Sequence, residues 1–186
     1  MPILHSDEGF ALLFADPSAA ELDLAVSAMM RPFPAGLMTD AGLLVANPVL
    51  APPALQAKFS PAAYHGAVVW SWQQALVAAG LERQRARTDL PPATRARLRN
   101  AQARLWRVIL AARAVANSEL WSWRYAGGRY RITAFGAGRQ DVDESNAAQL
   151  WSTVYLAVRP TDIGRRETPS PSAAPRADRA RAAPRR

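Results

Sequence analysis

The segment of residues 118–130, SELWSWRYAGGRY, places one carboxylate beside a series of aromatic side chains. Alternate residues of a β-strand point to the same face. We therefore expect one row that contains Glu119, Trp121, Trp123 and Tyr125. A core strand rarely contains the acid, and a solvent-exposed strand rarely contains three aromatic residues. The row predicts a surface that contacts a partner or a ligand.

Tryptophan rings beside carboxylates and amides are typical of sites that bind sugars. The rings stack on the apolar C–H faces of a sugar, and the polar groups bond its hydroxyls or act as acid and base. Three parts of the chain carry such groups at the ends of expected elements. The candidate residues are Tyr64, His65, Trp70, Trp72 and Gln73; Glu119, Trp121 and Trp123; and Asp141, Asp143, Glu144, Asn146 and Gln149.

Several of these candidates also have a purely structural interpretation. Apolar helical stripes, which are typical of a core, contain Trp70, Trp106 and Trp151. Glu144 precedes an expected helix, so capping and the helix dipole explain it as well as catalysis does. His65 is equally compatible with a buried histidine whose hydrogen bonds are satisfied. Glu119 is the hardest to explain structurally, because it interrupts an aromatic row.

The composition narrows the possible chemistry. The 186 residues suffice for one domain with a core. The absence of cysteine excludes disulfides, thiol catalysis and thiolate metal sites. The two histidines, His5 and His65, are too few for a histidine-rich metal centre. We expect neither a metal nor an organic cofactor.

The positive charge is concentrated in the last part of the chain. The net charge is +8, of which residues 159–186 carry +5 and residues 1–158 carry +3. The last segment is rich in Arg, Pro and Ala and is expected to be a disordered tail. A nucleic-acid-binding protein that acts through this tail is an alternative function, but the weak charge of residues 1–158 argues against nucleic acid as the main partner.

The sequence indicates neither secretion nor a membrane. The first 14 residues, MPILHSDEGFALLF, lack the basic and continuous apolar regions of a signal peptide. No run approaches the ~20 apolar residues of a membrane span. We therefore expect a cytoplasmic protein without a membrane partner.

Periodicity predicts a mainly α fold. Helices are expected over 16–30, capped by Asp16 or Ser18, over 60–88, capped by Ser60, and over 90–117. Gly80 would mark the C-terminal bend of the second helix, and the last two helices would form an αα-hairpin. Residues 35–53 suggest an apolar loop or a short strand pair. A β-hairpin around Gly127-Gly128 and a last helix over 144–158 complete the expected elements.

Three segments carry a resemblance to a known class of enzymes. The segments AAYHGAVVWSWQQALVAAGL (62–81), NSELWSW (117–123) and ESNAAQLWSTVYLAV (144–158) resemble the C-terminal part of six-hairpin glycosidases. These are (α/α)6 toroids that include the glycogen-debranching amylo-α-1,6-glucosidases. Residues 5–14 and 32–48 look like the stretch before the last hairpins of that family. The similarity covers roughly residues 5–158, and residues 1–158 would form an incomplete toroid.

The resemblance implies roles for particular residues. A late glutamate of the family, shortly before the final helix, serves as general base, and in this chain that role falls on Glu119 or Glu144, with Glu119 preferred. The resemblance places Tyr64, His65, Trp70 and Trp72 in the segment that lines the sugar pocket. We add Gln73, Trp121, Trp123 and Asn146 to the substrate-binding candidates.

The resemblance also implies that this chain is only part of an enzyme. A toroid has twelve helices, and we expect about four here. The general acid of the family lies much earlier in its chains. We therefore expect a fragment of an α-glucosidase that acts on oligosaccharides or polysaccharides, is inactive alone, and pairs with the missing N-terminal half. A non-catalytic remnant or subunit is the other alternative.

Overall fold

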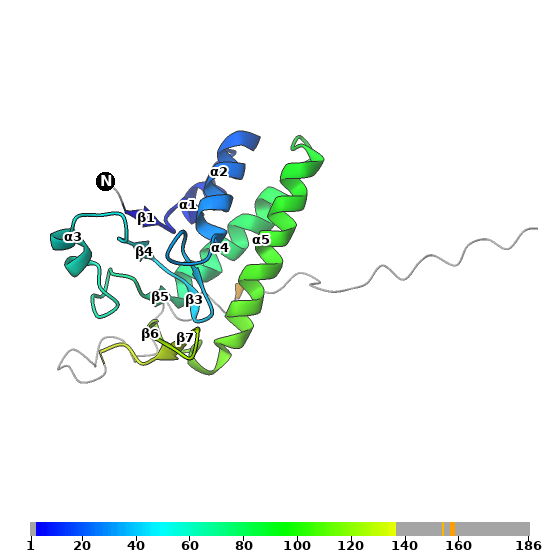
Figure 1. The fold of residues 1–186 in the computed structure, drawn as a ribbon. Coiled ribbons are helices and arrows are strands. Elements are labelled where there is room, and N and C mark those ends of the chain that lie inside the picture. Colours follow the sequence, from blue (N-terminus) through cyan, green and yellow to red (C-terminus); the bar gives the residue numbers. More distant parts are fainter. Residues whose placement is uncertain (1–2, 137–153, 155–156, 159–186) are drawn as a thin grey trace, which may run out of the picture.

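The computed structural model describes residues 3–136, 154, 157 and 158 (Figure 1). This part is mainly helical with small antiparallel sheets, which confirms the expected mainly α class for it. The helices are α1 (Glu8–Phe14), α2 (Ala19–Met30), α3 (Pro53–Lys58), α4 (Ser71–Arg85), α5 (Pro92–Ala111) and the short 3-10 helix η1 (Arg113–Val115). The strands are β1 (Leu4–His5), β2 (Met38–Thr39), β3 (Gly42–Leu43), β4 (Ala46–Asn47), β5 (Val69–Trp70), β6 (Leu120–Ala126) and β7 (Arg129–Thr133). They form the sheets β1-β4, β2-β3 and β5-β6-β7.

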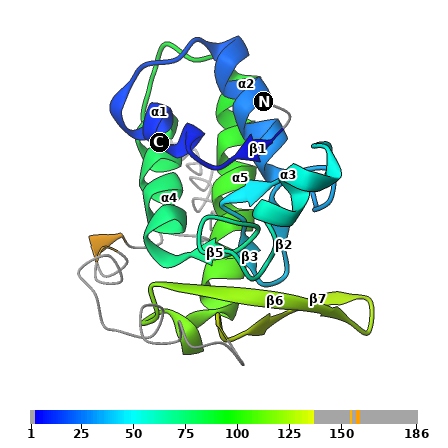
Figure 2. The same ribbon diagram turned by 90° about the vertical axis from the view of Figure 1, so that its left-hand side faces the viewer.

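Two helical hairpins, α1–α2 and α4–α5, pack against each other so that α1 and α4 form one layer and α2 and α5 form the other (Figure 2). Helix α1 packs on α4, and α2 packs on α5. Two hydrogen bonds show the relative direction of α1 and α4. Gln73 at the start of α4 donates to Asp7, directly before α1, and Gln84 near the end of α4 donates to the Leu12 carbonyl near the end of α1. Helices α1 and α4 are therefore parallel. Buried residues of all four helices share one main core, including Leu12, Leu22, Val26, Leu81, Leu105 and Ile109.

Two glycines allow α1 and α4 to approach closely. A Cβ at Gly80 would lie 2.7 Å from Leu12 Cβ, and a Cβ at Gly9 would lie 2.7 Å from Val77 Cγ2. Real Cβ contacts are longer than this. Gly80, which was expected to mark the C-terminal bend of the helix over 60–88, lies inside α4 and allows the close contact with α1.

The predicted helix over 60–88 is wrong at its start. Residues 60–68 form turns without a helix, and α4 begins only at Ser71. Val69 and Trp70 instead pair with Trp121 and Leu120 as strand β5. Buried backbone groups must be paired, and here the sheet supplies the partners that a longer helix would have supplied. Ser60 is therefore not a helix cap.

Other local predictions are confirmed. Ser18 caps α2, since its hydroxyl accepts from the Glu21 N–H at 3.3 Å and the Glu21 carboxylate accepts from the Ser18 N–H at 2.8 Å. The expected αα-hairpin is formed by α4 and α5. Strands β6 and β7 form the expected β-hairpin, and Gly127 and Gly128 both adopt positive φ, as a two-residue turn of this kind requires. The last predicted helix, over 144–158, falls mostly outside the described residues, as does the whole tail over 159–186.

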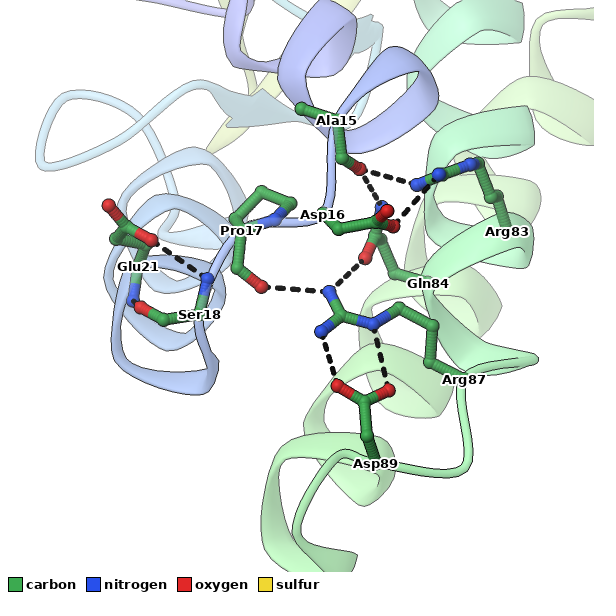
Figure 3. Close-up of polar contacts among 9 residues, drawn as sticks. All are labelled: Ala15, Asp16, Pro17, Ser18, Glu21, Arg83, Gln84, Arg87 and Asp89. Carbon is green, nitrogen blue, oxygen red and sulfur yellow. Dashed lines mark hydrogen bonds and ion pairs between the residues drawn. The ribbon is translucent and has the colours of Figure 1, made fainter.

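A polar network joins the turns of the two helical hairpins (Figure 3). The buried Gln84 side chain donates to the Ala15 carbonyl at 2.9 Å and accepts from Arg87 at 2.9 Å. Arg87 also donates to the Pro17 carbonyl at 2.8 Å and holds Asp89 through two hydrogen bonds of 3.1 and 2.6 Å. One arginine thus ties the α4–α5 turn to the α1–α2 turn.

This network is expected to make the stability of the protein sensitive to acid. The hydrogen bond from Arg87 lowers the pKa of Asp89 below its usual range. The folded state therefore binds fewer protons there than the unfolded state, whose aspartates titrate at about 3.9. The stabilisation is present above about pH 3.9 and is lost as the pH falls through the folded pKa. Urea unfolding should show a destabilisation of Asp89→Asn at neutral pH that disappears in acid; the same destabilisation at both pH values would contradict this.

Among the helices that the structure describes, none combines the length and the apolar composition that a membrane span requires.

Candidate functional site

A buried carboxylate lies where β6 meets the start of α4. Glu119 directly precedes β6, and its carbonyl accepts from the Ser71 N–H at 2.9 Å and from the Ser71 hydroxyl at 3.0 Å. Only 2% of Glu119 is exposed. Its Oε1 accepts a hydrogen bond from the Tyr64 hydroxyl, and its Oε2 is buried without a hydrogen-bond partner among the described residues. A buried carboxylate oxygen without a partner is costly, so this atom requires an explanation.

The Tyr64 side chain is held in place by other rings. Its ring lies 5.1 Å from Trp70, 6.2 Å from Phe135 and 4.9 Å from His65, measured between ring centroids. The Trp70 indole also donates to the Tyr64 carbonyl at 3.1 Å. Trp70 and Phe135 belong to a second, smaller hydrophobic cluster against which Tyr64 packs. The turns over residues 60–68 thus place a phenol directly at the Glu119 carboxylate.

A continuous series of aromatic rings leads from this carboxylate to the surface. Centroid distances are 5.5 Å from Trp70 to Trp72, 6.1 Å from Trp72 to Phe10 and 6.3 Å from Phe10 to Phe14. Phe10 and Phe14 are exposed on α1. We call this series the aromatic strip; its members are Tyr64, His65, Trp70, Trp72, Phe10 and Phe14. Trp70 is buried and Tyr64 and Trp72 are partly buried, so the exposed rings of His65, Phe10 and Phe14 are the ones most available to stack on a ligand or a partner.

His65 lies on the surface. Its side chain is exposed, and its ring lies 5.1 Å from the Trp70 ring. The interpretation as a buried histidine is therefore wrong. The imidazole stands over the second hydrophobic cluster, close to Tyr64, where a ligand could reach it.

Gln73 connects the first turn of α4 to the start of α1. Its side chain is buried, and its Nε2 donates to Asp7 Oδ1 at 3.2 Å, whereas its Oε1 has no hydrogen-bond partner among the described residues. Asp7 Oδ2 lies 3.9 Å from His5 Nδ1 and is largely exposed. Sequence reasoning missed Asp7. Its position directly before a helix was the available signal, and that signal alone indicates only a cap.

Trp121 and Trp123 lie apart from the cluster that holds Glu119. The Trp121 ring is in the main core, and its indole donates to the Ala41 carbonyl at 2.8 Å. The Trp123 indole donates to the Ala67 carbonyl at 2.7 Å, and its ring packs against Tyr130 with centroids 5.0 Å apart. Both indole N–H groups are thus used within the protein. A role of these two residues in substrate binding stays a prediction.

The remaining candidates cannot be placed. Glu144 and Asn146, together with Asp141, Asp143 and Gln149, lie outside the described residues. Within the part of the chain that is described, no three His, Cys, Asp or Glu side chains lie together in a way that could hold a metal ion.

The site is therefore an acid, a phenol and an imidazole at the start of α4, with aromatic rings leading outward. Compared with family models, with curated proteins and with solved structures, the chain has no significant match.

Proposed function

We propose that this chain is the C-terminal part of a six-hairpin (α/α)6 glycoside hydrolase of the α-glucosidase, glycogen-debranching kind, with Glu119 as its general base. The observation that carries the proposal is the Glu119 carboxylate. Tyr64 donates to one of its oxygens, the other has no hydrogen-bond partner among the described residues, and a series of aromatic rings leads from Tyr64 to the surface. A general base needs such an oxygen to take a proton from water.

The arrangement of the helices supports a piece of a toroid. In a toroid, equivalent hairpins follow one another around a ring, with one helix of each inside and the other outside. The parallel pairing of α1 with α4, and the packing of α2 on α5, fit two successive hairpins of this kind. Helix α4 is buried along most of its length, as an inner helix would be. Glu119, Tyr64 and Trp72 lie at the start of this helix.

One side of the first hairpin is open, which supports a further hairpin there. A surface cavity of about 330 Å³ lies between α1 and α2 and is lined mainly by small and apolar side chains. Phe14 on α1 and Leu24 on α2 are exposed to 72% and 74%. Large apolar side chains that are exposed on both helices would be covered by a further hairpin. The general acid, which must stand opposite the base, would come from the hairpins that cover this edge.

The proposed mechanism uses the described residues as follows. Trp72 and His65 contact the sugar, whose C–H faces suit their rings. Tyr64 holds Glu119 in one orientation, and Glu119 Oε2 takes a proton from the attacking water. Gln73 Oε1, which has no protein partner in the described part, accepts from a sugar hydroxyl. Without an acid to protonate the leaving oxygen, the chain alone releases no sugar at a useful rate.

Sugar binding by the isolated chain tests the proposal. Tryptophan fluorescence of the purified protein should respond to maltotriose or isomaltotriose, and Trp72→Ala should abolish the response. Tyr125→Ala is the matched control, because Tyr125 is an exposed ring on β6, outside the aromatic strip. The assignment of this site would be overturned if the protein bound neither sugar up to the solubility limit of the sugar, or if Trp72→Ala bound as well as the wild type. Glucose release by the chain alone would overturn the expected inactivity.

A further inference from the structure

A groove lined by arginines runs along the α2–α5 layer. Two surface cavities of about 410 and 590 Å³ adjoin there and share Pro32 and Arg104 in their linings. The first lies between the end of α2 and the middle of α5, and the second continues between α5 and the start of β7. We call the two together the basic groove; the side chains that matter are Arg31, Arg97, Arg104, Arg107, Arg129 and Tyr130.

Most of these cations have no acidic partner. Arg97 forms an ion pair of 2.7 Å with Asp23. For the other four arginines of the basic groove, no carboxylate of the described residues lies within ion-pair distance. Among the described residues, Asp40 is the one acid in either lining, and its Oδ2 already accepts from the Tyr130 N–H at 3.2 Å. The basic groove is therefore a strongly positive surface, although residues 1–158 as a whole carry only +3.

The arginines are spread along the groove and do not converge on one point. Arg97 and Arg104 are two helical turns apart on α5, which separates them by about 10 Å along the axis. Arg107 lies one turn beyond, and Arg129 continues the series on β7. A single small anion would contact only one or two of them. The spacing fits a chain that carries a negative charge at regular intervals.

An aromatic ring lies in the wall of the same groove. The Tyr130 ring is half-buried and is held by neighbours, with centroids 5.0 Å from Trp123 and 5.6 Å from Phe33. Positively charged grooves with fixed aromatic rings are the usual means of binding single-stranded nucleic acid, because every base offers a face for stacking. In a duplex the bases are already stacked on one another, so the ring would have no partner.

We propose that the basic groove binds single-stranded nucleic acid, with arginines on its phosphates and Tyr130 stacked on a base. This site is independent of the proposed glycosidase function, because it lies on the α2–α5 layer, whereas Glu119 and Trp72 lie at the start of α4. Its residues all lie outside the segment 159–186. Failure of either proposal leaves the other standing.

The test measures binding of a fluorescently labelled polyuridine strand to the full chain as salt is varied. Each phosphate contact to a single strand contributes about 0.7 to the slope of log affinity against log salt. Arg104→Gln/Arg107→Gln should therefore reduce the slope by about 1.4, which corresponds to about 25-fold weaker binding at roughly 0.1 M salt. The matched control is Arg99→Gln/Arg113→Gln, which removes the same charge from residues outside the groove.

Tyr130 is tested separately from the charges. Tyr130→Leu should weaken binding about 5- to 150-fold without changing the salt slope, since loss of base stacking costs about 1–3 kcal/mol. Tyr130→Phe keeps the ring and should bind as the wild type does. This pair also controls for folding, because a loss of binding through misfolding would be accompanied by a lowered thermal unfolding temperature.

Three results would overturn the proposal. If Arg104→Gln/Arg107→Gln and the control Arg99→Gln/Arg113→Gln weakened binding equally, general charge or the tail would carry the binding. A duplex bound as tightly as the single strand would exclude a groove that selects unpaired bases. Heparin bound as tightly as polyuridine, with no effect of Tyr130→Leu on either, would show that the groove responds to charge alone.

Discussion

Replacing Trp121 by alanine is expected to lower the free energy of unfolding by about 3–5 kcal/mol, the usual cost of removing a large buried ring. Trp121 is 2% exposed, belongs to the main core and donates its indole N–H to the Ala41 carbonyl. The substitution leaves both a cavity and a buried carbonyl without its donor. Small domains are stable by only about 5–15 kcal/mol, so urea unfolding should register this loss clearly.

Trp121→Phe and Tyr125→Ala complete this test. The phenylalanine keeps most of the ring and loses the hydrogen bond, so we expect a cost of about 1–2 kcal/mol. Tyr125→Ala removes an exposed ring and should lower the free energy of unfolding by about 0.5 kcal/mol or less. If Trp121→Ala left the stability unchanged but removed sugar binding, Trp121 would be a ligand platform, and the core position would not be its role.

Replacing Glu119 by glutamine is expected to lower turnover by about 10²–10⁴-fold in a longer glycosidase that carries this segment, the usual effect of losing a general base. The glutamine oxygen can still accept from the Tyr64 hydroxyl, so the fold keeps this contact. It cannot take a proton from water. The free energy of unfolding should therefore change little while the rate of glucose release collapses.

Glu144→Gln is the comparison for the Glu119 variant. If Glu144→Gln abolishes turnover and Glu119→Gln leaves it intact, the base is the residue before the last helix. If neither matters, the buried Glu119 is a structural acid held by Tyr64, and the resemblance has pointed to the wrong site. Loss of stability in Glu119→Gln without loss of turnover would lead to the same conclusion.

Local signals in the sequence predicted the elements that depend on nearby residues. Ser18 and Glu21 are three positions apart, so their reciprocal capping can be predicted without knowing the rest of the fold. The turn of the β6–β7 hairpin needs two residues with positive φ, which Gly127 and Gly128 supply. The apolar periodicity over residues 90–117 predicts a long helix, and the structure has α5 there (Pro92–Ala111).

The sequence-based predictions were wrong for residues whose structure depends on contacts with segments distant in the chain. Val69 and Trp70 are compatible with a helix, but they pair with β6, about 50 residues away, and no local signal indicates this pairing. Gly80 looks like a bend near a helix end in the sequence, and only the structure shows that its role is to let α1 approach at Leu12. Both features depend on a partner that the local pattern does not contain.

The same division applies to the candidate site and the groove. The sequence by itself determined that Glu119 stands among aromatic residues, because this follows from the spacing of residues 119–125 along one element. Only the tertiary structure decided which rings meet the acid. It placed Tyr64 on Glu119 and put Trp121 in the core, since packing, and not alternation along β6, selects the neighbours of a buried side chain. It likewise joined the arginines of α5 to Arg31 and Arg129, because charges from three separate elements become one surface only when those elements fold together.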